Sequence, residues 1–173
     1  MVLKKFKLIV IGGGTSGLRL ALNSASRGYN TALIEPGLLG GTCLNTGCIP
    51  TKALLHSSHL YKQSLKNSQF GIKTSLKIDL NRIMKRAHSI INEGQIHIKK
   101  SVKKFKNLTI IRNKSSFIDG KTILAGNEKL TADKIVICTG AKNFVPPIKG
   151  LDKINYLDNS SILKLKKLPK SII

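Results

Sequence analysis

The sequence predicts an α/β fold with a Rossmann-like parallel sheet and a small β-meander. Three observations predict it. An apolar run ends in a glycine-rich turn, a helical segment and a second apolar run follow that turn, and several short strand-like segments lie further along the chain. Two parallel strands joined by a helix form the unit from which such sheets are built. With 173 residues, 41% of them hydrophobic, the chain is long enough to bury a core as one domain.

The first strand–helix–strand unit occupies residues 8–35. An apolar strand over 8–11 enters the glycine-rich turn, a helix over 18–26 follows and is closed by Gly28, and a second strand covers 31–35. The elements fall in the order that a βαβ unit requires. We therefore interpret the intervening glycines as part of a binding site and not as an ordinary turn.

The turn has the spacing Gly-x-Gly-x-x-Gly, at Gly12, Gly14 and Gly17. Gly12 permits the tight turn, Gly14 lets a pyrophosphate approach the backbone, and Gly17 lets the helix pack closely on the strand. Glu35, at the end of the second strand, can accept hydrogen bonds from a ribose. The sequence therefore predicts a dinucleotide site.

Two cysteines, Cys43 and Cys48, lie five residues apart shortly after this unit. On a regular helix that separation places the Cα atoms roughly 8–9 Å apart, which is beyond the span of a disulfide. We therefore expect Cys43 to lie off the helix that begins near Pro50, with Gly47 relaxing the backbone between the sulfurs. Cys48 then sits near a helix N-terminus, where the helix dipole favours the thiolate. Two unrelated buried thiols are the alternative.

The run Gly41-Thr42-Cys43-Leu44-Asn45-Thr46-Gly47-Cys48-Ile49-Pro50-Thr51-Lys52 resembles the active-site signature of the class I pyridine nucleotide-disulfide oxidoreductases. This family includes dihydrolipoamide dehydrogenase, glutathione reductase and mercuric reductase. The resemblance implies that the first βαβ unit binds the ADP part of FAD. It also implies that Cys48 is the charge-transfer thiolate beside the flavin and that Cys43 is the interchange sulfur. The cofactor-binding residues that it implies are Gly12, Gly14, Thr15, Ser16, Gly17, Glu35, Gly41, Thr42, Lys52, Thr139 and Gly140.

Later segments complete the expected FAD-binding domain. Residues 78–106 are predicted to form a helix, and 108–111, 116–124 and 129–131 short strands, with a turn at Asp119-Gly120. Residues 133–140 read as an apolar strand and tight turn that resemble the family strand closing the FAD site, with Cys138 as a buried strand residue in place of an alanine. The family often has glycines where this chain has Asn113-Lys114-Ser115-Ser116, so larger side chains here would narrow the approach to the cofactor.

The resemblance divides the chain into residues 1–150, the FAD-binding domain with the redox-active disulfide, and residues 151–173, a linker and the start of an NAD(P)-binding domain. Family members continue with an NAD(P) site, a second FAD segment and an interface domain that carries a catalytic His-Glu pair. The histidines of this chain, His56, His59, His88 and His97, fall outside those parts. We therefore expect a chain truncated before the NAD(P) domain, incomplete for turnover alone, with a separately encoded C-terminal half or a decayed gene as explanations.

Charge and cysteine content bear on partners and location. With 30 Lys and Arg against 8 Asp and Glu, the net charge is +22, yet the basic residues are scattered except at 99–106. We therefore expect salt-sensitive sticking to polyanions but no specific nucleic-acid partner. No apolar run is long enough for a membrane span or a signal peptide, so we expect no membrane partner. Three cysteines, two of them a redox pair, fit a cytoplasmic protein.

A metal site is the competing interpretation of the cysteines. Cys43, Cys48, His56 and His59 form a C-x4-C-x7-H-x2-H array. The loop between the two pairs is shorter, and the His-x2-His spacing tighter, than zinc sites usually have. We therefore expect no metal site, with His56 and His59 as polar residues on a helix surface.

The resemblance implies that NAD(P)H reduces FAD, that FAD reduces the Cys43–Cys48 disulfide, and that the dithiol then acts on a small dithiol or disulfide substrate, as in dihydrolipoamide dehydrogenase. A mercuric-reductase-like activity, mildly favoured by Asn45-Thr46-Gly47, and a non-catalytic flavin-binding fragment are the alternatives. Lipoamide, glutathione and mercuric ion all remain candidate substrates, with either NADH or NADPH as reductant. Complete family members are homodimers.

Overall fold

The computed structural model describes residues 3–173. The chain forms two compact units. The first comprises the chain up to Cys43 together with Gly94–Phe144, and the second comprises Leu44–Glu93 together with Val145–Ile173. The first unit holds the sheet and the glycine-rich turn, and the second is built mainly from helices.

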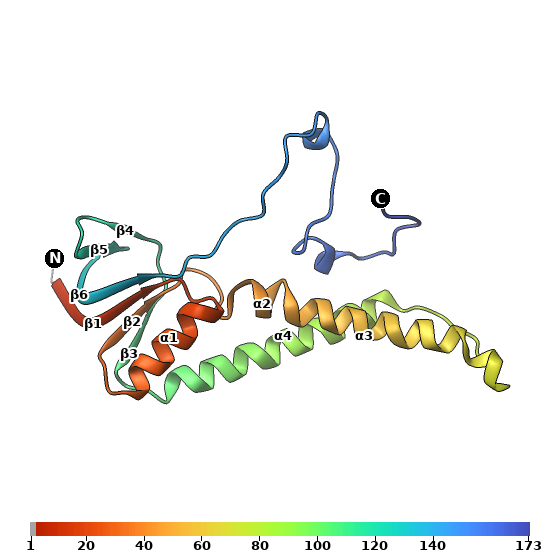
Figure 1. Cartoon of the computed structure of the whole chain (residues 1–173), viewed down its shortest axis with the longest axis horizontal. Helices are drawn as coiled ribbons and strands as arrows, with labels where there is room; N and C mark the ends of the chain where they lie inside the picture. The colour runs from red at the N-terminus through yellow and green to blue at the C-terminus, as the bar shows by residue number, and fades with distance from the viewer. Residues whose placement is uncertain (1–2) are drawn as a thin grey trace. The chain divides into compact units, whose positions relative to one another are not determined.

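A six-stranded sheet with the order β3-β2-β1-β6-β5-β4 forms the centre of the first unit. Strands β3, β2, β1 and β6 are parallel neighbours, whereas β6, β5 and β4 are antiparallel. The helix α1, Thr15–Ser26, joins β1 to β2 and packs on this parallel part (Figure 1). The strands are β1 Leu3–Ile11, β2 Thr31–Ile34, β3 Leu108–Ile111, β4 Ser115–Phe117, β5 Thr122–Ala125 and β6 Glu128–Ile137. The predicted α/β fold with a parallel sheet and a β-meander is therefore confirmed.

The strand register brings the carboxyl ends of three strands to one edge of the sheet. Ile11, the last residue of β1, is paired with Ile34 in β2 and with Ile137 in β6. Ligands of open α/β sheets bind beyond the carboxyl ends of the strands. The segments that begin at Gly12, Glu35 and Cys138 therefore share the edge at which such a ligand would bind.

Two hydrophobic clusters cover the two faces of β1, because neighbouring residues of a strand point to opposite faces. Ile9 belongs to one cluster, with Ile34, Ile123 and Leu130, and all four are at most 1% exposed. Val10 belongs to the other, which contains α1 residues, Leu33, Leu39 and Leu108 and is extended by Ile98 and Val102 of the helix α4, Leu80–Lys103. All four residues of β2 are buried, as in a parallel strand covered on both faces.

The meander agrees with the sequence prediction in its turn and differs from it in the extent of its last strand. The segment 116–124, predicted with a turn at Asp119-Gly120, is a hairpin of β4 and β5, and Asp119 closes the turn by accepting hydrogen bonds from the N–H groups of Lys121 and Thr122, both at 2.8 Å. These contacts, the Lys121 N–H first, hold the pKa of Asp119 below its ordinary value. Residues 129–131 and 133–137 belong to one strand, β6, because β6 pairs with β1 from Lys129 to Ile137.

That pairing also extends β1 towards the N-terminus, to Leu3 in place of the predicted Leu8. Its lysines lie at the surface, where Lys4 pairs with Glu128 and Lys7 with Asp133, the latter at 2.8 Å. The hydrogen bond with Asp133 raises the pKa of Lys7, and the same bond lowers the pKa of Asp133. Both pairs are exposed to water, so their contribution to stability is small.

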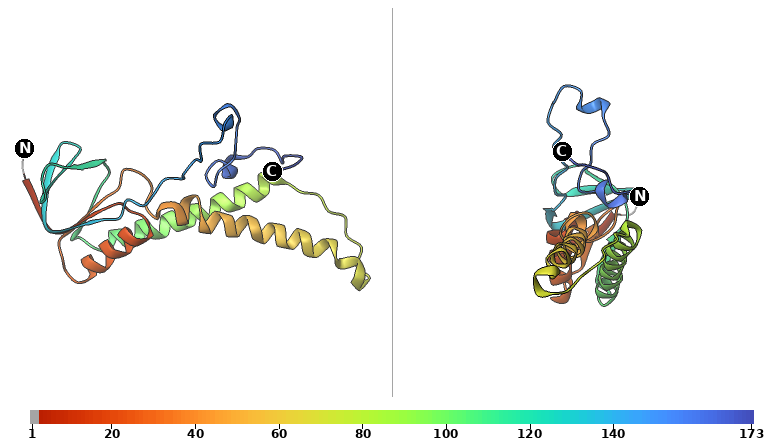
Figure 2. Two further views of the ribbon diagram at one scale, coloured as in Figure 1. Left: turned by 45° about the horizontal axis from the view of Figure 1, so that its top comes forward. Right: turned by 90° about the vertical axis from the view of Figure 1, so that its right-hand side faces the viewer.

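The second unit contains α3, Cys48–Leu65, which is one continuous helix followed by η1, Asn67–Phe70 (Figure 2). The helix α4 covers Leu80–Lys103 and is slightly shorter than the helix predicted over residues 78–106. Arg86 of α4 donates to the carbonyl of Ala53 in α3 at 3.2 Å. The C-terminal segment of this unit contains η2, Leu151–Lys153, and η3, Ile162–Lys164, which buries Leu163.

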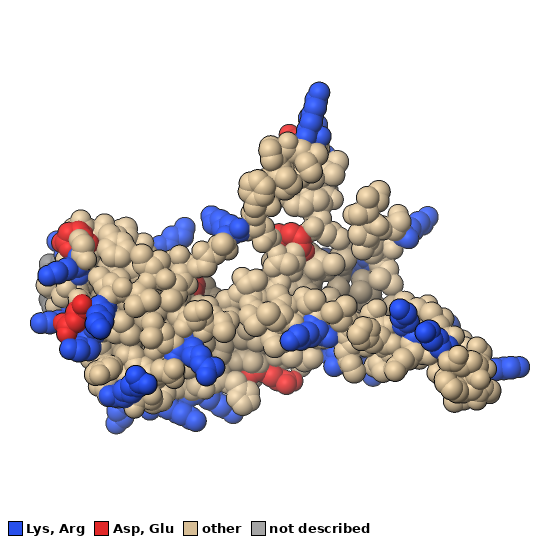
Figure 3. All heavy atoms as spheres, viewed as in Figure 1, with Lys and Arg blue, Asp and Glu red and all other residues tan. Residues whose placement is uncertain are grey.

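Lysine and arginine side chains are spread over the surface and do not form one dense patch on the face shown in Figure 3. This distribution follows the scatter of basic residues along the sequence. Among the helices of residues 3–173, none has the length and apolar character needed to cross a membrane.

Replacing Leu33 with alanine should lower the free energy of unfolding by about 2–5 kcal/mol, because the wild-type side chain is 0% exposed and its loss leaves a cavity. Leu38→Ala is the matched control, since Leu38 is 61% exposed and should change stability by about 0.5 kcal/mol or less. Urea unfolding followed by circular dichroism measures both. Equal effects of the two substitutions would contradict the placement of β2 in the core.

Candidate functional site

The glycine-rich turn connects β1 to α1 through two contacts that exclude larger side chains. Gly12 has a φ of +104°, and a Cβ atom there would lie 2.3 Å from the carbonyl oxygen of Cys138. A Cβ atom on Gly17 would lie 1.9 Å from the carbonyl oxygen of Gly12. The tight turn predicted for Gly12 and the close packing predicted for Gly17 are therefore both present.

Gly14 lies in a different environment. The nearest atom to a Cβ built on Gly14 is 3.9 Å away, and the α1 helix begins at the next residue. The first N–H groups of a helix have no partner within it and carry partial positive charge. Residues 15–18, the first turn of α1, include no acidic side chain, and Thr15 and Ser16 are exposed. This arrangement suits an anionic group such as a pyrophosphate.

The carboxylate of Glu35 connects two loops at the edge of the sheet. One oxygen, Oε2, accepts a hydrogen bond from the N–H of Gly13 at 2.7 Å, and Oε1 accepts one from the N–H of Gly37 at 2.8 Å. A carboxylate oxygen can accept more than one hydrogen bond. Glu35 can therefore hold the glycine-rich turn in place and still accept hydrogen bonds from ligand hydroxyls. The sequence did not indicate the contact with Gly13.

A cavity of about 300 Å³ lies at the carboxyl ends of the parallel strands. The lining residues are the last residues of β1 and β2, the first residue of β4, and loop residues after β1, β2, β3 and β6: Ile11, Gly12, Ile34, Glu35, Pro36, Asn113, Lys114, Ser115 and Thr139. Gly12, Glu35 and Thr139 were predicted to bind cofactor. Asn113, Lys114 and Ser115, which the sequence predicts only to narrow the approach to the cofactor, form one wall of the cavity. Their position after β3 is the signal that identifies them, because β3 ends in register with β2.

The loop that leads to Cys43 is attached to the glycine-rich turn. The N–H of Gly40 donates to the carbonyl of Gly13 at 2.8 Å, and a Cβ atom on Gly41 would lie 2.7 Å from the Cα of Gly14. Leu39 is 2% exposed, and its carbonyl accepts a hydrogen bond from Nε2 of Gln95 at 2.7 Å. Sequence reasoning missed Gln95, which carries no motif and acts through its position on α4.

The two cysteines lie on different helices. Cys43 is half-buried in the short helix α2, Gly41–Asn45, whereas Cys48 is exposed as the first residue of α3. Thr46 and Gly47 separate the helices, and the first hydrogen bond of α3 runs from the N–H of Thr51 to the carbonyl of Gly47 at 3.0 Å. The predictions that Cys43 lies off the helix and that Cys48 is at its N-terminus are confirmed.

Four further residues that the sequence singled out, Thr42, Lys52, Cys138 and Gly140, are found at the following positions. Thr42 and Lys52 are exposed, and Gly140 has a φ of +70° with open space where a Cβ would be. Cys138 differs from the prediction, because it is half-buried and follows the last residue of β6. Its N–H still donates to the carbonyl of Ile11, at 2.6 Å.

The histidines near the cysteine pair do not form a metal site with it in residues 3–173. His56 and His59 are exposed on α3, and the described part of the chain gathers no group of three or more His, Cys, Asp or Glu side chains suited to a metal ion.

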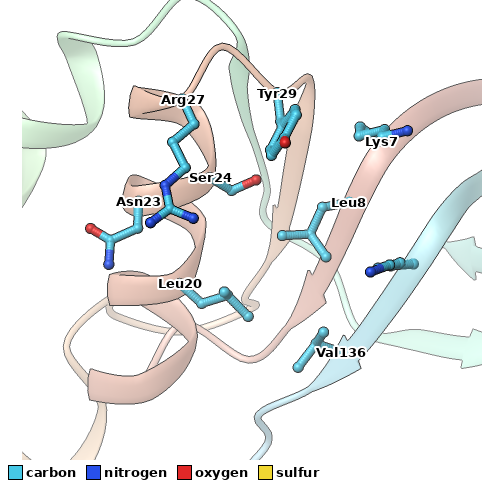
Figure 4. Close-up of a pocket in the computed structure, with 9 residues that line it drawn as sticks. Lys7, Leu8, Leu20, Asn23, Ser24, Arg27, Tyr29 and Val136 are labelled. Atoms are coloured by element: carbon cyan, nitrogen blue, oxygen red, sulfur yellow. The ribbon is translucent and has the colours of Figure 1, made fainter.

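A further cavity of about 390 Å³ lies between α1 and the strands β1 and β6 (Figure 4). Leu8, Leu20 and Val136 are among its apolar lining residues, and none of the predicted site residues lines it.

Comparison with known proteins places this geometry in a family. The chain is 32% identical over 168 residues to a mercuric reductase of Lysinibacillus sphaericus, covering 96% of this chain and 31% of that protein. It is 31% identical over 173 residues to a dihydrolipoyl dehydrogenase of Bacillus subtilis (strain 168), covering 96% of this chain and 38% of that protein. The chain thus spans about a third of the length of these relatives.

The fold is likewise found among solved structures. The HOCl-induced flavoprotein disulfide reductase RclA from Escherichia coli superimposes with a TM-score of 0.77 and 31% sequence identity, over 94% of this chain and 35% of that chain. The family described as pyridine nucleotide-disulphide oxidoreductase matches residues 6–173. The matched residues include both the glycine-rich turn and the cysteine pair. The chain therefore belongs to the pyridine nucleotide-disulphide oxidoreductase family.

Proposed function

We propose that this chain binds FAD, with the ADP part at the carboxyl edge of the parallel sheet. The observation that carries the proposal is the open approach at Gly14 between two glycines that have no room for a side chain. The N-terminus of α1 would hold the pyrophosphate through the backbone of Gly14, Thr15 and Ser16. Glu35, which lines the cavity, would accept hydrogen bonds from the adenosine ribose.

The resemblance assigns further residues to this cofactor. Thr139 lines the same cavity, and Gly140 follows it in the turn after β6. Gly41 packs on Gly14, so the loop that carries Thr42 is fixed beside the pyrophosphate position. Lys52 is proposed to lie beside the flavin. When bound, FAD would supply two electrons taken from NAD(P)H.

We further propose that Cys43 and Cys48 are the redox-active pair that receives these electrons. Reduction of their disulfide takes up two electrons and two protons and gives the dithiol. The Cys43 thiolate then attacks one sulfur of a small disulfide substrate, forms a mixed disulfide and releases one thiolate. The Cys48 thiolate attacks the Cys43 sulfur, releases the second substrate thiol and restores the disulfide. The positive end of α3 at Cys48 supports this role.

The substrate proposed first is a small disulfide that is reduced by these steps, or a small dithiol that is oxidised by their reverse, as proposed for a chain similar to the dihydrolipoyl dehydrogenases. A mercuric-ion substrate is the second candidate, because the relatives include mercuric reductases and paired thiolates prefer soft metal ions. The chain spans about a third of these relatives. We therefore propose that turnover with NAD(P)H also needs the rest of the family fold, in this or another polypeptide, as a homodimer. The reducing environment that such a dithiol requires favours the cytoplasm.

Glu35→Ala should weaken FAD binding by about 1–3 kcal/mol, because hydrogen-bonding groups of the ribose and of the two loops lose their acceptor. Titration of FAD at moderate salt, followed by quenching of its fluorescence, measures the affinity. Glu128→Ala is the matched control, since Glu128 is an acid on β6 whose partner is Lys4. Equal affinities of wild type and Glu35→Ala would remove Glu35 from the site.

The substitutions Gly14→Ala and Gly17→Ala should affect different properties, the first the affinity for FAD and the second the stability of the fold. Gly14→Ala leaves the fold intact, because its Cβ meets no atom closer than 3.9 Å, but it obstructs the pyrophosphate and weakens FAD binding. Gly17→Ala lowers the melting temperature even without FAD, because its Cβ would collide with the carbonyl of Gly12. Thermal unfolding with and without FAD distinguishes them. A Gly14→Ala protein that binds FAD like wild type would argue against the proposed pyrophosphate position.

Mild reduction of the oxidised chain should expose two additional thiols to alkylation, both from the Cys43–Cys48 pair. Cys43→Ser and Cys48→Ser should each abolish this gain, whereas Cys138→Ser should retain it. Mass spectrometry of the alkylated chain after equilibration in glutathione buffers counts the thiols. If Cys43 and Cys48 both stay alkylatable under oxidising conditions, the redox pairing is wrong.

A further inference from the structure

The segment between the two cysteines receives a contact from the C-terminal part of the second unit. Nδ2 of Asn159 donates a hydrogen bond to the carbonyl oxygen of Thr46 at 3.0 Å and lies 3.4 Å from Oγ1 of the same residue. The Thr46 carbonyl belongs to the peptide bond with Gly47, the residue that precedes α3. Asn159 therefore holds the backbone directly before Cys48.

Asn159 is itself held by a closed turn. The Asp158 carboxylate accepts hydrogen bonds from the N–H of Ser160 at 3.0 Å and from the N–H of Ser161 at 2.6 Å. The Ser161 hydroxyl donates to the same carboxylate at 2.7 Å and accepts from the N–H of Asp158, also at 2.7 Å. Such side-chain contacts with the backbone fix a turn. The η3 helix follows at once and buries Leu163, which anchors the turn.

We infer that Asn159 is a positioning residue that keeps the Thr46–Gly47 segment preorganised for closure of the Cys43–Cys48 disulfide. The inference rests on the proposed redox pairing of these cysteines. In the disulfide form the covalent ring already restricts this segment, whereas in the dithiol form the Asn159 contact restricts it. Loss of the contact therefore gives more freedom to the dithiol than to the disulfide. The equilibrium shifts towards the dithiol.

The thiol–disulfide equilibrium constant should shift about three- to tenfold, which corresponds to the net free energy of one hydrogen bond. A tenfold change corresponds to about 30 mV for a two-electron couple, in the direction of easier reduction. Asn159→Asp keeps the shape of the side chain but has no N–H to donate. It should shift the equilibrium as far as Asn159→Ala does.

The test equilibrates the full 173-residue chain in glutathione redox buffers and measures the disulfide fraction by alkylation and mass spectrometry. Ser160→Ala is the matched control, because the contact that Ser160 makes in the Asp158 turn uses its backbone N–H and should leave the equilibrium within about twofold. Cys138, outside the pair, is the internal reference for labelling. Circular dichroism checks that each variant is folded.

A shift towards the dithiol in both Asn159 variants, with Ser160→Ala unchanged, supports the inference. Equilibria of folded Asn159→Asp and Asn159→Ala that match wild type, or that move towards the disulfide, overturn the role of Asn159 and leave the proposed function standing. If the wild-type chain forms no Cys43–Cys48 disulfide in any buffer, the proposed function fails, and the role of Asn159 fails with it.

Discussion

The close contact between Gly12 and Gly17 is the constraint on which the candidate site depends. It seats the first turn of α1 against the end of β1, where a Cβ on Gly17 would overlap the Gly12 carbonyl. The same contact directs the N-terminus of α1 towards the carboxyl edge of the sheet. Because Gly12 also lies against the carbonyl of Cys138, β1, α1 and the end of β6 meet at one point. A change at this point would move every group that surrounds the proposed pyrophosphate position.

Hydrogen bonds transmit this fixed geometry to the neighbouring loops. Glu35 connects the end of β2 to Gly13, and Gly40 connects the following loop to the carbonyl of Gly13. Gln95 holds the same loop from α4 through the carbonyl of Leu39. Cys43 therefore follows directly on a segment that is tied to the glycine-rich turn. This arrangement gives a physical reason for finding the cofactor motif and the first cysteine in one compact unit.

The large positive charge has little part in holding the fold. The ion pairs Lys4–Glu128 and Lys7–Asp133 are exposed and therefore weak. With a net charge of +22, repulsion between basic groups opposes compaction, and burial in the two hydrophobic clusters must outweigh it. The charge does favour the approach of anions, including a pyrophosphate, in a salt-dependent manner.

Sequence alone determined the elements whose signals are local. The βαβ unit, the glycine spacing, the turn at Asp119-Gly120 and the helix beginning at Cys48 follow from strand and helix periodicity, glycine conformations and helix geometry. The length of β1 and the continuity of β6 were missed, because the charged residues within these strands interrupt the apolar pattern and the pairing of β1 with β6 shows only in the folded chain.

The tertiary structure decided which side chains meet. The contacts of Glu35 with Gly13, of Gln95 with Leu39 and of Asn159 with Thr46 all join segments distant in sequence. The wall formed by residues 113–115 likewise lies beside the ends of β1, β2 and β6 only in the folded chain. Each depends on strand register or helix packing, which no single segment encodes. The chemistry of the site was thus readable from short motifs, whereas the hydrogen bonds that position its groups appear only when the chain is folded, because those bonds join residues that the sequence separates.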